Sequence, residues 1–404
     1  MEAPLEGLRV LDLSRVLAGP FAGRMLSDLG ADVVKVESPE GDVTRGWGHR
    51  RHGLAGYFTQ QNAGKRSLRI DFASAGGPEL VRRLAERADV LIENFRPGVM
   101  ARHGLAWKDL SARNRRLVML SISGFGQDGP ESRRAAYAAV LHAEAGIVAR
   151  QTDEHGSRPA DPVLSIADYN AGLHGLVALL AALHMRARTG RGQHIDLAML
   201  DTMLATDDYA NFALDEVPLI RGGGEVWEAP GGPLMIVGEF RAVWKLLSRH
   251  RGVADPTPPG APLEEKIRLR REAAADYFRA FPDRASLIAV LDELNLAWGD
   301  VRSTAEGFRS PTARARGSVA QVDDRGGGRR PVVQSPYRFS DARSGVARGP
   351  AHLGEHDREV LAEWLGAGQD EIDGLERDGT LGVRAARPEP GAREAHDETR
   401  ERRP

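Results

Sequence analysis

The chain of 404 residues contains no cysteine. This absence excludes disulfide bonds, a zinc site built from thiolates and a cysteine nucleophile. The opening residues, MEAPLEGLRVLDLS, also lack the basic and then apolar pattern of a secretory signal peptide. Together the two absences predict a cytoplasmic protein.

Long apolar runs and an excess of charge of one sign are missing as well. The longest apolar stretch, at about residues 173–183, is too short to span a bilayer and contains His174. The formal net charge is only -2, which argues against a general nucleic-acid binder. We therefore expect a globular protein with neither a membrane nor a nucleic acid as partner, long enough for two domains.

Short runs of Val, Ile and Leu alternate with helical segments over the first 125 residues, and one helix is expected from about Gly23. Such alternation predicts an α/β fold with a parallel sheet covered by helices. The apolar runs are LRVLDL, ADVVKVE, LRIDF, ADVLIEN and LVMLSIS.

The composition changes after about Leu214, where glycine and proline become frequent around PLMIVG and FRAVWKLLSRH. This change indicates a smaller α+β domain inserted into the large one. We expect the first part of the large domain over 1–214, the small domain over 215–325 and a return to the large domain over 326–380. The charged, proline-bearing residues 381–404 are expected to form a disordered tail.

One carboxylate, Asp168, stands at the start of an apolar helix. Apolar residues recur at spacings of three and four between Leu173 and Leu183, and Gly190 and Gly192 end the run. The local pattern alone favours a helix N-cap, because an aspartate oxygen accepts hydrogen bonds from nearby backbone N–H groups. A carboxylate on a rigid helix can also serve as a nucleophile or base.

The first strand, turn and helix are similar to a nucleotide-binding βαβ unit, with Glu37 ending the second strand. The turn contains Gly19 and Gly23 but no G-x-G-x-x-G pattern. Without two closely spaced glycines, the backbone is not expected to approach the pyrophosphate of a dinucleotide closely. A dehydrogenase is therefore disfavoured.

Cationic and amide side chains cluster in loops that we place at the carboxyl ends of strands, where open α/β sheets bind ligands. Arginine offers paired planar donors to phosphate oxygens. Each residue alone is compatible with solvated surface charge, but the set predicts a ligand that carries phosphates. Its members are Arg45, Asn62, Lys65, Arg66, Asn94, Arg96 and Arg102.

Several motifs in a fixed order resemble the class III coenzyme A transferases, the CaiB/BaiF group, which includes formyl-CoA transferase, carnitine CoA-transferase and the α-methylacyl-CoA racemases. The similarity runs from about Leu5 to Leu375. It implies a Rossmann-like large domain built from both ends of the chain, a small domain between them, and an interlocked homodimer. The motifs are LEGLRVLDLSRVLAGPFAGRMLSDLGADVVKVE, GKRSLRIDF, ADVLIENFRPG, SGFGQDGP, the Asp168 segment with TGRGQ, and SPYRFS followed by GPAHLGEH.

Asp168 matches the aspartate of the family's A-D-x-x-x-G pattern, together with Ala167 and Gly172. The resemblance implies that this carboxylate attacks an acyl-CoA thioester, forming an anhydride and then an aspartyl-CoA thioester, from which CoA passes to an acceptor acid. With an ordinary pKa of about 4 the group would be ionised without a base. The resemblance further implies no metal and no tightly bound cofactor, since CoA and acyl-CoA are substrates.

The resemblance also implies a set of residues around CoA, with the basic members near its phosphates. Ala18, next to Gly19 and Pro20, would leave room for the nucleotide or the pantetheine arm. We add Arg45 from its place in GDVTRGW. The expected set is Val16, Ala18, Arg45, Lys65, Asn94, Phe95, Arg96, Ala101 and Arg102.

Racemases of this family carry a His-Asp pair where this chain has Tyr137 and Ala138. Tyrosine, with a pKa of about 10, is a poor substitute for imidazole in moving a proton. An acyl-CoA racemase or epimerase is thus the alternative to a transferase, and a catalytically silent CoA-binding protein would not need Asp168. Tyr137 and His142, which stands where many relatives have Gln, are candidates for the substrate pocket.

Three features stay open at this stage: the roles of His142 and Glu144, and a loop over the site formed by Gly222–Gly224.

Overall fold

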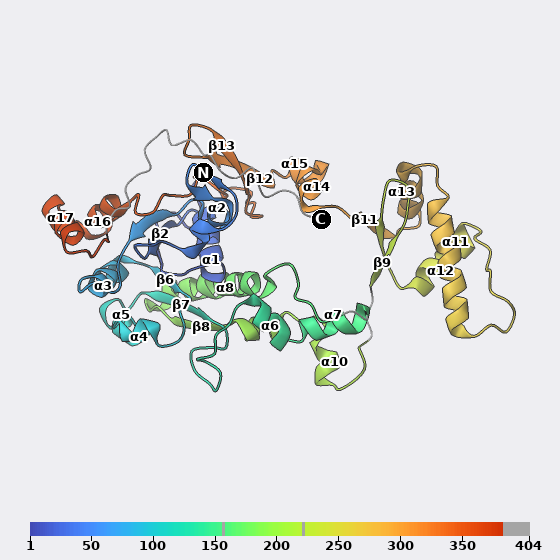
Figure 1. Cartoon of the computed structure of the whole chain (residues 1–404), viewed down its shortest axis with the longest axis horizontal. Helices are drawn as coiled ribbons and strands as arrows, with labels where there is room; N and C mark the ends of the chain where they lie inside the picture. Colours follow the sequence, from blue (N-terminus) through green and yellow to red (C-terminus); the bar gives the residue numbers. More distant parts are fainter. Residues whose placement is uncertain (156–157, 220–222, 383–404) are drawn as a thin grey trace, which may run out of the picture. The chain divides into compact units, whose positions relative to one another are not determined.

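The computed structural model describes residues 1–155, 158–219 and 223–382, which form two compact units (Figure 1). The first contains Met1–Asp207 and the chain from Gly317 onward; the second is Asp208–Arg316. Strand β12 (Val319–Asp323), expected in the small domain, therefore belongs to the large unit, and helix α10 (Ala210–Leu214) belongs to the small one. Most of the expected tail, 383–404, lies outside the described residues.

The large unit is built on a six-stranded parallel sheet with the order β5-β2-β1-β6-β7-β8. Counted along the chain, these strands stand in the order 3-2-1-4-5-6, which is that of the Rossmann fold. The expected Rossmann-like architecture is confirmed. The strands are β1 (Arg9–Asp12), β2 (Asp32–Glu37), β5 (Arg66–Arg69), β6 (Val90–Glu93), β7 (Val118–Ser123) and β8 (His194–Ala198).

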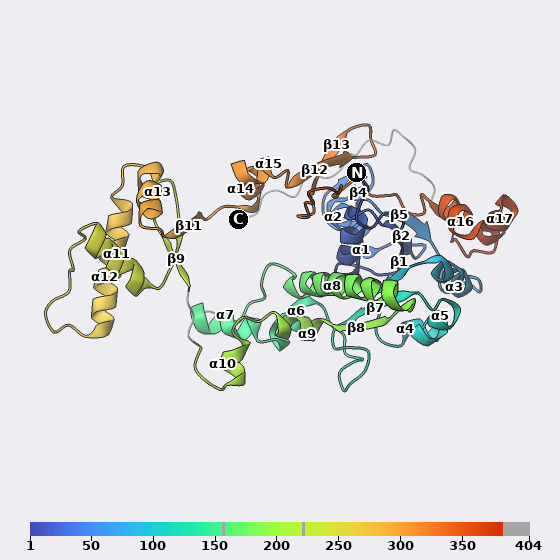
Figure 2. The ribbon, with the colours of Figure 1, turned by 180° about the vertical axis from the view of Figure 1, so that it is seen from behind.

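Helices cover both faces of this sheet (Figure 2). Val10 packs in the core under α1 (Ala18–Asp28) and α8 (Ile166–Thr189), whereas Leu11 packs in the core under α3 (Gly77–Arg87) and α16 (Asp357–Leu365). Burial on both faces explains why the strands appear in the sequence as continuous Val, Ile and Leu runs. Because α16 comes from the C-terminal segment, both ends of the chain build this unit.

Shorter elements complete the large unit. They are η1 (Val43–Gly46), the hairpin β3 (Arg50–Arg51) and β4 (Leu54–Ala55), α2 (Gly56–Asn62), α4 (Val99–Arg102), α5 (Trp107–Arg113), α6 (Ala138–Glu144), α7 (Ile147–His155), α9 (Met199–Ala205), β12 paired with β13 (Arg329–Val333), and α17 (Gln369–Arg377).

Helix α1 begins at Ala18, five residues before the expected start. Pro20 is tolerated there because the first turn of a helix has no backbone hydrogen bond for it to remove. Gly19 is needed there, since a Cβ atom at this position would lie 2.2 Å from the Cβ of Ser14. The early start brings the N-terminus of α1 directly against the loop after β1.

Helix α8 approaches its neighbours through two glycines. A Cβ at Gly172 would lie 2.7 Å from the ring of Phe21 and 2.9 Å from the carbonyl oxygen of Ala18, both on α1. A Cβ at Gly175 would lie 2.8 Å from the Leu120 side chain on β7. The helix ends as expected at Gly190, whose φ of 72° is left-handed. Glycine thus sets how closely α8 lies on α1 and on the sheet.

The 24 residues of α8 exceed the apolar run expected from the sequence, and among the described residues it is the helix long and apolar enough to cross a membrane. The length of α8 therefore does not exclude a transmembrane span. Its packing argues against one, because its inner face is buried in the core beneath α1 and β7. The outer face leaves Leu173, Val177 and Leu180 exposed.

The small unit has the α+β character that we expected. Three antiparallel strands in the order β11-β10-β9 pack with helices around a core that includes Trp227, Trp244 and Phe278. Its elements are β9 (Gly224–Trp227), β10 (Leu234–Val237), α11 (Phe240–His250), α12 (Leu263–Arg279), α13 (Arg284–Glu293), β11 (Ala297–Asp300), α14 (Thr304–Arg309) and α15 (Pro311–Ala315), with α10 before them.

The close approach of α8 to α1 makes Gly172→Ala a specific test. We expect a loss of about 1–3 kcal/mol in the free energy of unfolding, because the added methyl group must push the two helices apart. Gly374→Ala in α17 is the matched control: a Cβ there meets no atom within 4 Å, so we expect a gain of about 0.5–1 kcal/mol. Urea unfolding measures both; equal effects at the two positions would contradict the packing argument.

Candidate active site

The order of the sheet reverses between β1 and β6, and ligands of open α/β sheets bind outside the carboxyl ends of the strands at that point. The loops that follow these two strands are tied together by Asn94. Its Oδ1 accepts a hydrogen bond from the Arg15 N–H at 2.7 Å, and its Nδ2 donates to the Arg15 carbonyl at 2.8 Å. Val16, Ala18 and Asn94, which the family resemblance placed around CoA, therefore lie in one region.

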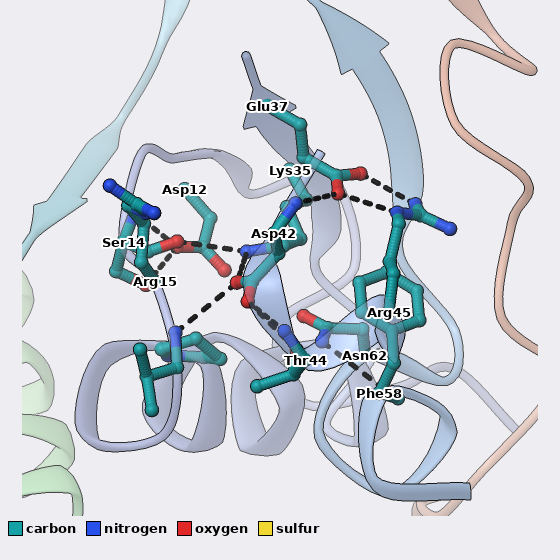
Figure 3. Close-up of polar contacts among 12 residues, drawn as sticks. Asp12, Ser14, Arg15, Lys35, Glu37, Asp42, Thr44, Arg45, Phe58 and Asn62 are labelled. Carbon is teal, nitrogen blue, oxygen red and sulfur yellow. Dashed lines mark hydrogen bonds and ion pairs between the residues drawn. The ribbon is translucent and has the colours of Figure 1, made fainter. Parts of the chain in front are cut away.

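The loop after β1 has a strained backbone that hydrogen bonds hold in place. Val16 has a φ of 67°, in the left-handed region that a β-branched residue rarely adopts. Its N–H donates to Asp42 at 3.2 Å, and Asp42 in turn contacts the ammonium of Lys35 at 3.0 Å (Figure 3). Lys35 also donates to the Ser14 carbonyl at 2.8 Å. Buried charges thus fix the backbone at the switch point of the sheet.

Asp42 shows that this network favours ionised groups. Burial opposes the charge, but Lys35 and the hydrogen bonds from Thr44 outweigh it and lower the pKa of Asp42 to about 2. The carboxylate therefore stays ionised at every pH where the protein is expected to work.

Lys65 and Arg66 do not stand where the sequence analysis placed them. Both were assigned to the carboxyl end of a strand, whereas Lys65 precedes β5 and Arg66 begins it. The ammonium of Lys65 is buried and donates to Asp12, Pro20 and Asn62 at 2.7–2.9 Å. These three acceptors match its three N–H donors, so Lys65 acts here as a support of the β1–α1 segment.

Arg45 follows β2, as predicted, but its charge is balanced inside the protein. Its guanidinium makes two hydrogen bonds with Glu37, at 2.6 and 2.7 Å, and a third to the Ala351 carbonyl at 3.1 Å. It also lies 3.8 Å from the centre of the Phe58 ring (Figure 3). By contrast, Arg96 and Arg102 are exposed.

The remaining predicted CoA residues surround the loop after β6. Phe95 packs against the core, with its ring centre 6.3 Å from that of Phe72. Ala101 is exposed on α4, one residue before Arg102. The exposed cations therefore lie on the same side of the switch point as Asn94.

Asp168 is the third residue of α8, which has Ser165 as its N-cap. The capping hypothesis is wrong, because the backbone N–H that acts on the Asp168 carboxyl is that of Ala18, the first residue of α1. This half-buried carboxyl therefore faces the N-terminus of another helix, where partial positive charge favours an anion.

The assumption of an ordinary pKa for Asp168 is also wrong. Burial raises its pKa to about 6, although the Ala18 N–H and the nearby His142 act in the opposite direction. At neutral pH this value leaves about ten ionised carboxyl groups for each protonated one. The group remains a usable nucleophile and is more basic than a solvated aspartate.

Two tyrosines near Asp168 were missed by the sequence analysis. Tyr169 packs edge-on against Phe21, with ring centres 4.9 Å apart, and its hydroxyl accepts a hydrogen bond from Gln61 at 3.2 Å. Burial, with the charges of Tyr169 and Asp168, raises the pKa of Tyr57 to about 12. Tyr57 and Gln61 are four residues apart on α2, a spacing that could have marked one helix face.

The two pocket candidates occupy different environments. Tyr137 is the N-cap residue of α6 and is exposed. His142 is fully buried, and both of its ring nitrogens contact protein groups, Asp161 and the Ala167 N–H. His142 is therefore not open to a bound acid in this structure. Glu144 is exposed and pairs with Arg134.

The large unit also contains a cavity, whose lining does not include Asp168. The cavity, of about 600 Å³, is lined by Lys65, by the β12–β13 hairpin and by residues 347–351, 355 and 356. Gly222 lies outside the described residues, and Gly224 begins β9 in the small unit. Within the described ranges no three His, Asp or Glu side chains are grouped as they would be around a metal ion.

Comparison with known proteins identifies the family of this chain. The model of CoA-transferase family III matches residues 5–357. The chain belongs to CoA-transferase family III.

Relatives support the same assignment for this CoA-transferase. It is 34% identical over 385 residues to a succinate–glutarate CoA-transferase of Agrobacterium fabrum, covering 89% of this chain and 95% of the relative. It is 33% identical over 419 residues to a formyl-CoA:oxalate CoA-transferase of Streptomyces avermitilis, covering 94% and 100%. The crystal structure of a CaiB/BaiF family protein from Brucella suis superposes with a TM-score of 0.77 at 36% identity, covering 90% of this chain and 100% of that one.

The raised pKa of Asp168 generates a prediction for the stability of this CoA-transferase. The folded-state pKa of about 6 exceeds the ordinary aspartate value of 3.8, so the wild type loses stability as pH rises from about 4 to 6. Asn cannot titrate; we therefore expect the melting temperature of Asp168→Asn, relative to wild type, to rise over this range.

Asp42→Asn is the control of opposite sign. Its pKa is lowered to about 2, so the wild-type carboxylate contributes stability above about pH 4 that is lost as pH falls toward 2. The melting temperature of this variant relative to wild type should therefore fall as pH rises between those values. The same sign of slope for both variants would contradict the assignment of a buried, poorly compensated carboxyl at Asp168.

Proposed function

We propose that this CoA-transferase moves CoA from an acyl-CoA thioester to a carboxylic acid through a covalent intermediate on Asp168. The observation that carries the proposal is the place of the Asp168 carboxyl. It stands at the N-terminus of α1, next to Ala18, and thus at the loop that follows β1 at the switch point of the sheet.

The proposed chemistry needs only the carboxylate and the two substrates. A carboxylate oxygen of Asp168 attacks the thioester carbonyl, the carbon–sulfur bond breaks, and a mixed anhydride and CoA thiolate result. The thiolate then attacks the aspartyl carbonyl and releases the donor acid, leaving an aspartyl-CoA thioester. The acceptor carboxylate attacks this thioester, and the released thiolate takes the acceptor's acyl group from the new anhydride, which restores Asp168.

For CoA itself we propose the loops after β1 and β6 together with α4. Arg96 and Arg102 are exposed and suited to its phosphates, whereas Arg45 and Lys65 are engaged with Glu37 and Asp12 and support the loop backbone. The contact residues we propose are Val16, Ala18, Asn94, Phe95, Arg96, Ala101 and Arg102, with Tyr137 at the acyl end.

The acceptor is proposed to be a small dicarboxylic acid. This follows from the names of the relatives, in which glutarate, oxalate and D-citramalate appear as partner acids. The racemase alternative is not favoured, since these relatives are named as transferases and Tyr137 takes the place of the imidazole that moves the proton. The cytoplasmic location stays a prediction.

We also propose the interlocked homodimer implied by the family resemblance. The outer face of α8 supports it, because Leu173, Val177 and Leu180 form an exposed apolar stripe at helical spacing. A second copy of the chain would remove this stripe from water. Sedimentation velocity tests the proposal, and a monomer at micromolar concentration would contradict it.

Trapping tests the covalent step. The protein is incubated with succinyl-CoA or formyl-CoA, treated with hydroxylamine and digested, and the peptides are analysed by mass spectrometry. We expect an aspartyl hydroxamate at Asp168 in the wild type and none in Asp168→Asn. Asp201→Asn, which removes an exposed carboxylate on α9, is the control and should retain the modification at Asp168.

The rate of trapping should also depend on pH. Because the carboxylate is the nucleophile and its pKa is about 6, we expect about a tenfold fall per pH unit below that value and a plateau above about pH 7. Exchange of the α-proton of a 2-methylacyl-CoA with solvent deuterium, without any adduct, would overturn the transferase mechanism in favour of the racemase.

Removing an exposed cation tests the CoA site separately. We expect Arg102→Ala to raise KM for the acyl-CoA about tenfold with little change in kcat, because a hydrogen bond to a charged group contributes about 1.5 kcal/mol or more. Arg113→Ala is the control, since that exposed side chain is already paired with Glu79 and Glu86 on α3. Equal KM values in the two variants would remove Arg102 from the CoA site.

A further inference from the structure

The proposed chemistry leaves one buried imidazole without a role. His142 on α6 has no exposed surface. Its Nδ1 lies 2.7 Å from Oδ1 of Asp161, and its Nε2 lies 3.1 Å from the backbone nitrogen of Ala167. A backbone N–H can only donate, so Nε2 accepts and the proton stands on Nδ1, from which it is donated to Asp161. The two contacts therefore define one neutral tautomer.

Ala167 is the second residue of α8 and directly precedes Asp168. The first N–H groups of a helix lack partners within it, and an N-cap side chain normally accepts one of them. Ser165, the N-cap of α8, makes no such bond. The imidazole of His142, supplied by another helix, accepts the Ala167 N–H in its place.

We propose that His142, oriented by Asp161, is a positioning residue that fixes the first turn of α8 and thereby the carboxylate of Asp168. This inference rests on the proposed function of Asp168 as nucleophile. Without the acceptor, the first turn of α8 loses its tertiary anchor to α6. The carboxylate then moves relative to the N-terminus of α1, and a misplacement of about 1 Å can cost about 100-fold in rate.

Three substitutions separate this role from simple packing. His142→Leu fills the buried space but cannot accept the Ala167 N–H. His142→Gln keeps an acceptor and a donor. Asp161→Ala leaves the imidazole in place but removes the partner that sets its tautomer; Asp161 is 46% exposed at its side chain, so this variant leaves the core intact. Glu144→Gln, on the same helix but exposed and paired with Arg134, is the matched control.

Two measurements are made on the 404-residue chain. Hydrogen exchange resolved to the Ala167 amide reports the capping bond without any substrate. Steady-state kinetics with succinyl-CoA and glutarate report kcat and KM. For His142→Leu we expect faster exchange at Ala167, a kcat reduced about 10- to 100-fold and a KM for acyl-CoA within about twofold of wild type.

The other variants should form a series. Asp161→Ala is expected to lose less kcat than His142→Leu, His142→Gln to recover most of it, and Glu144→Gln to match the wild type. A His142→Leu variant with rapid exchange at Ala167 but full kcat would overturn the positioning role. Unchanged exchange would overturn the capping bond itself. A wild type with a protected Ala167 amide that transfers CoA to none of the three dicarboxylic acids and forms no adduct would instead refute the proposed function, and the catalytic part of this inference with it.

Discussion

The contact between α8 and α1 at Gly172 is the constraint on which the site depends. A side chain there would meet the Phe21 ring and the Ala18 carbonyl at less than 3 Å, so the two helices lie this close only because the residue is glycine. Asp168 stands one turn earlier on α8, and the same approach brings its carboxyl to the first N–H of α1. The packing of two helices thus creates the environment of the Asp168 carboxyl.

Two ways of burying a carboxylate stand side by side in this unit. Asp42 is compensated by Lys35 and Thr44, and its pKa falls to about 2; Asp168 has a backbone N–H and a more distant imidazole, and its pKa rises to about 6. The first arrangement suits a permanent anchor for the strained backbone at Val16. The second suits the role that we propose for Asp168, in which the group gains and loses a covalent partner, because strong ion pairing would have to be broken at each turnover.

Patterns of apolar residues predicted the parallel sheet, the helix that carries Asp168 and its end at Gly190, because these depend on local periodicity and on glycine. The family resemblance supplied what periodicity could not, namely the return of the C-terminal segment to the large unit. The predicted start of α1 was wrong, and so was the placement of Lys65 and Arg66 at the carboxyl end of a strand. Both depend on close contacts between distant segments. No local signal distinguishes an arginine paired with Glu37 from one free to bind phosphate, and His142 could be placed only once α6 and α8 were brought together.

The covalent intermediate that we propose on Asp168 would place opposing demands on its surroundings. An anhydride must be shielded from water, which requires burial, but burial alone would raise the pKa until the nucleophile became protonated at neutral pH. The half-buried position of Asp168 against the N-terminus of α1 meets both demands, because the helix end favours the negative charge without neutralising it by a full ion pair. A lysine in place of this helix end would lower the pKa of Asp168 more than the Ala18 N–H does. It would thus leave a less basic oxygen to attack the thioester. Backbone N–H groups held by helix packing therefore suit this chemistry better than a cationic side chain.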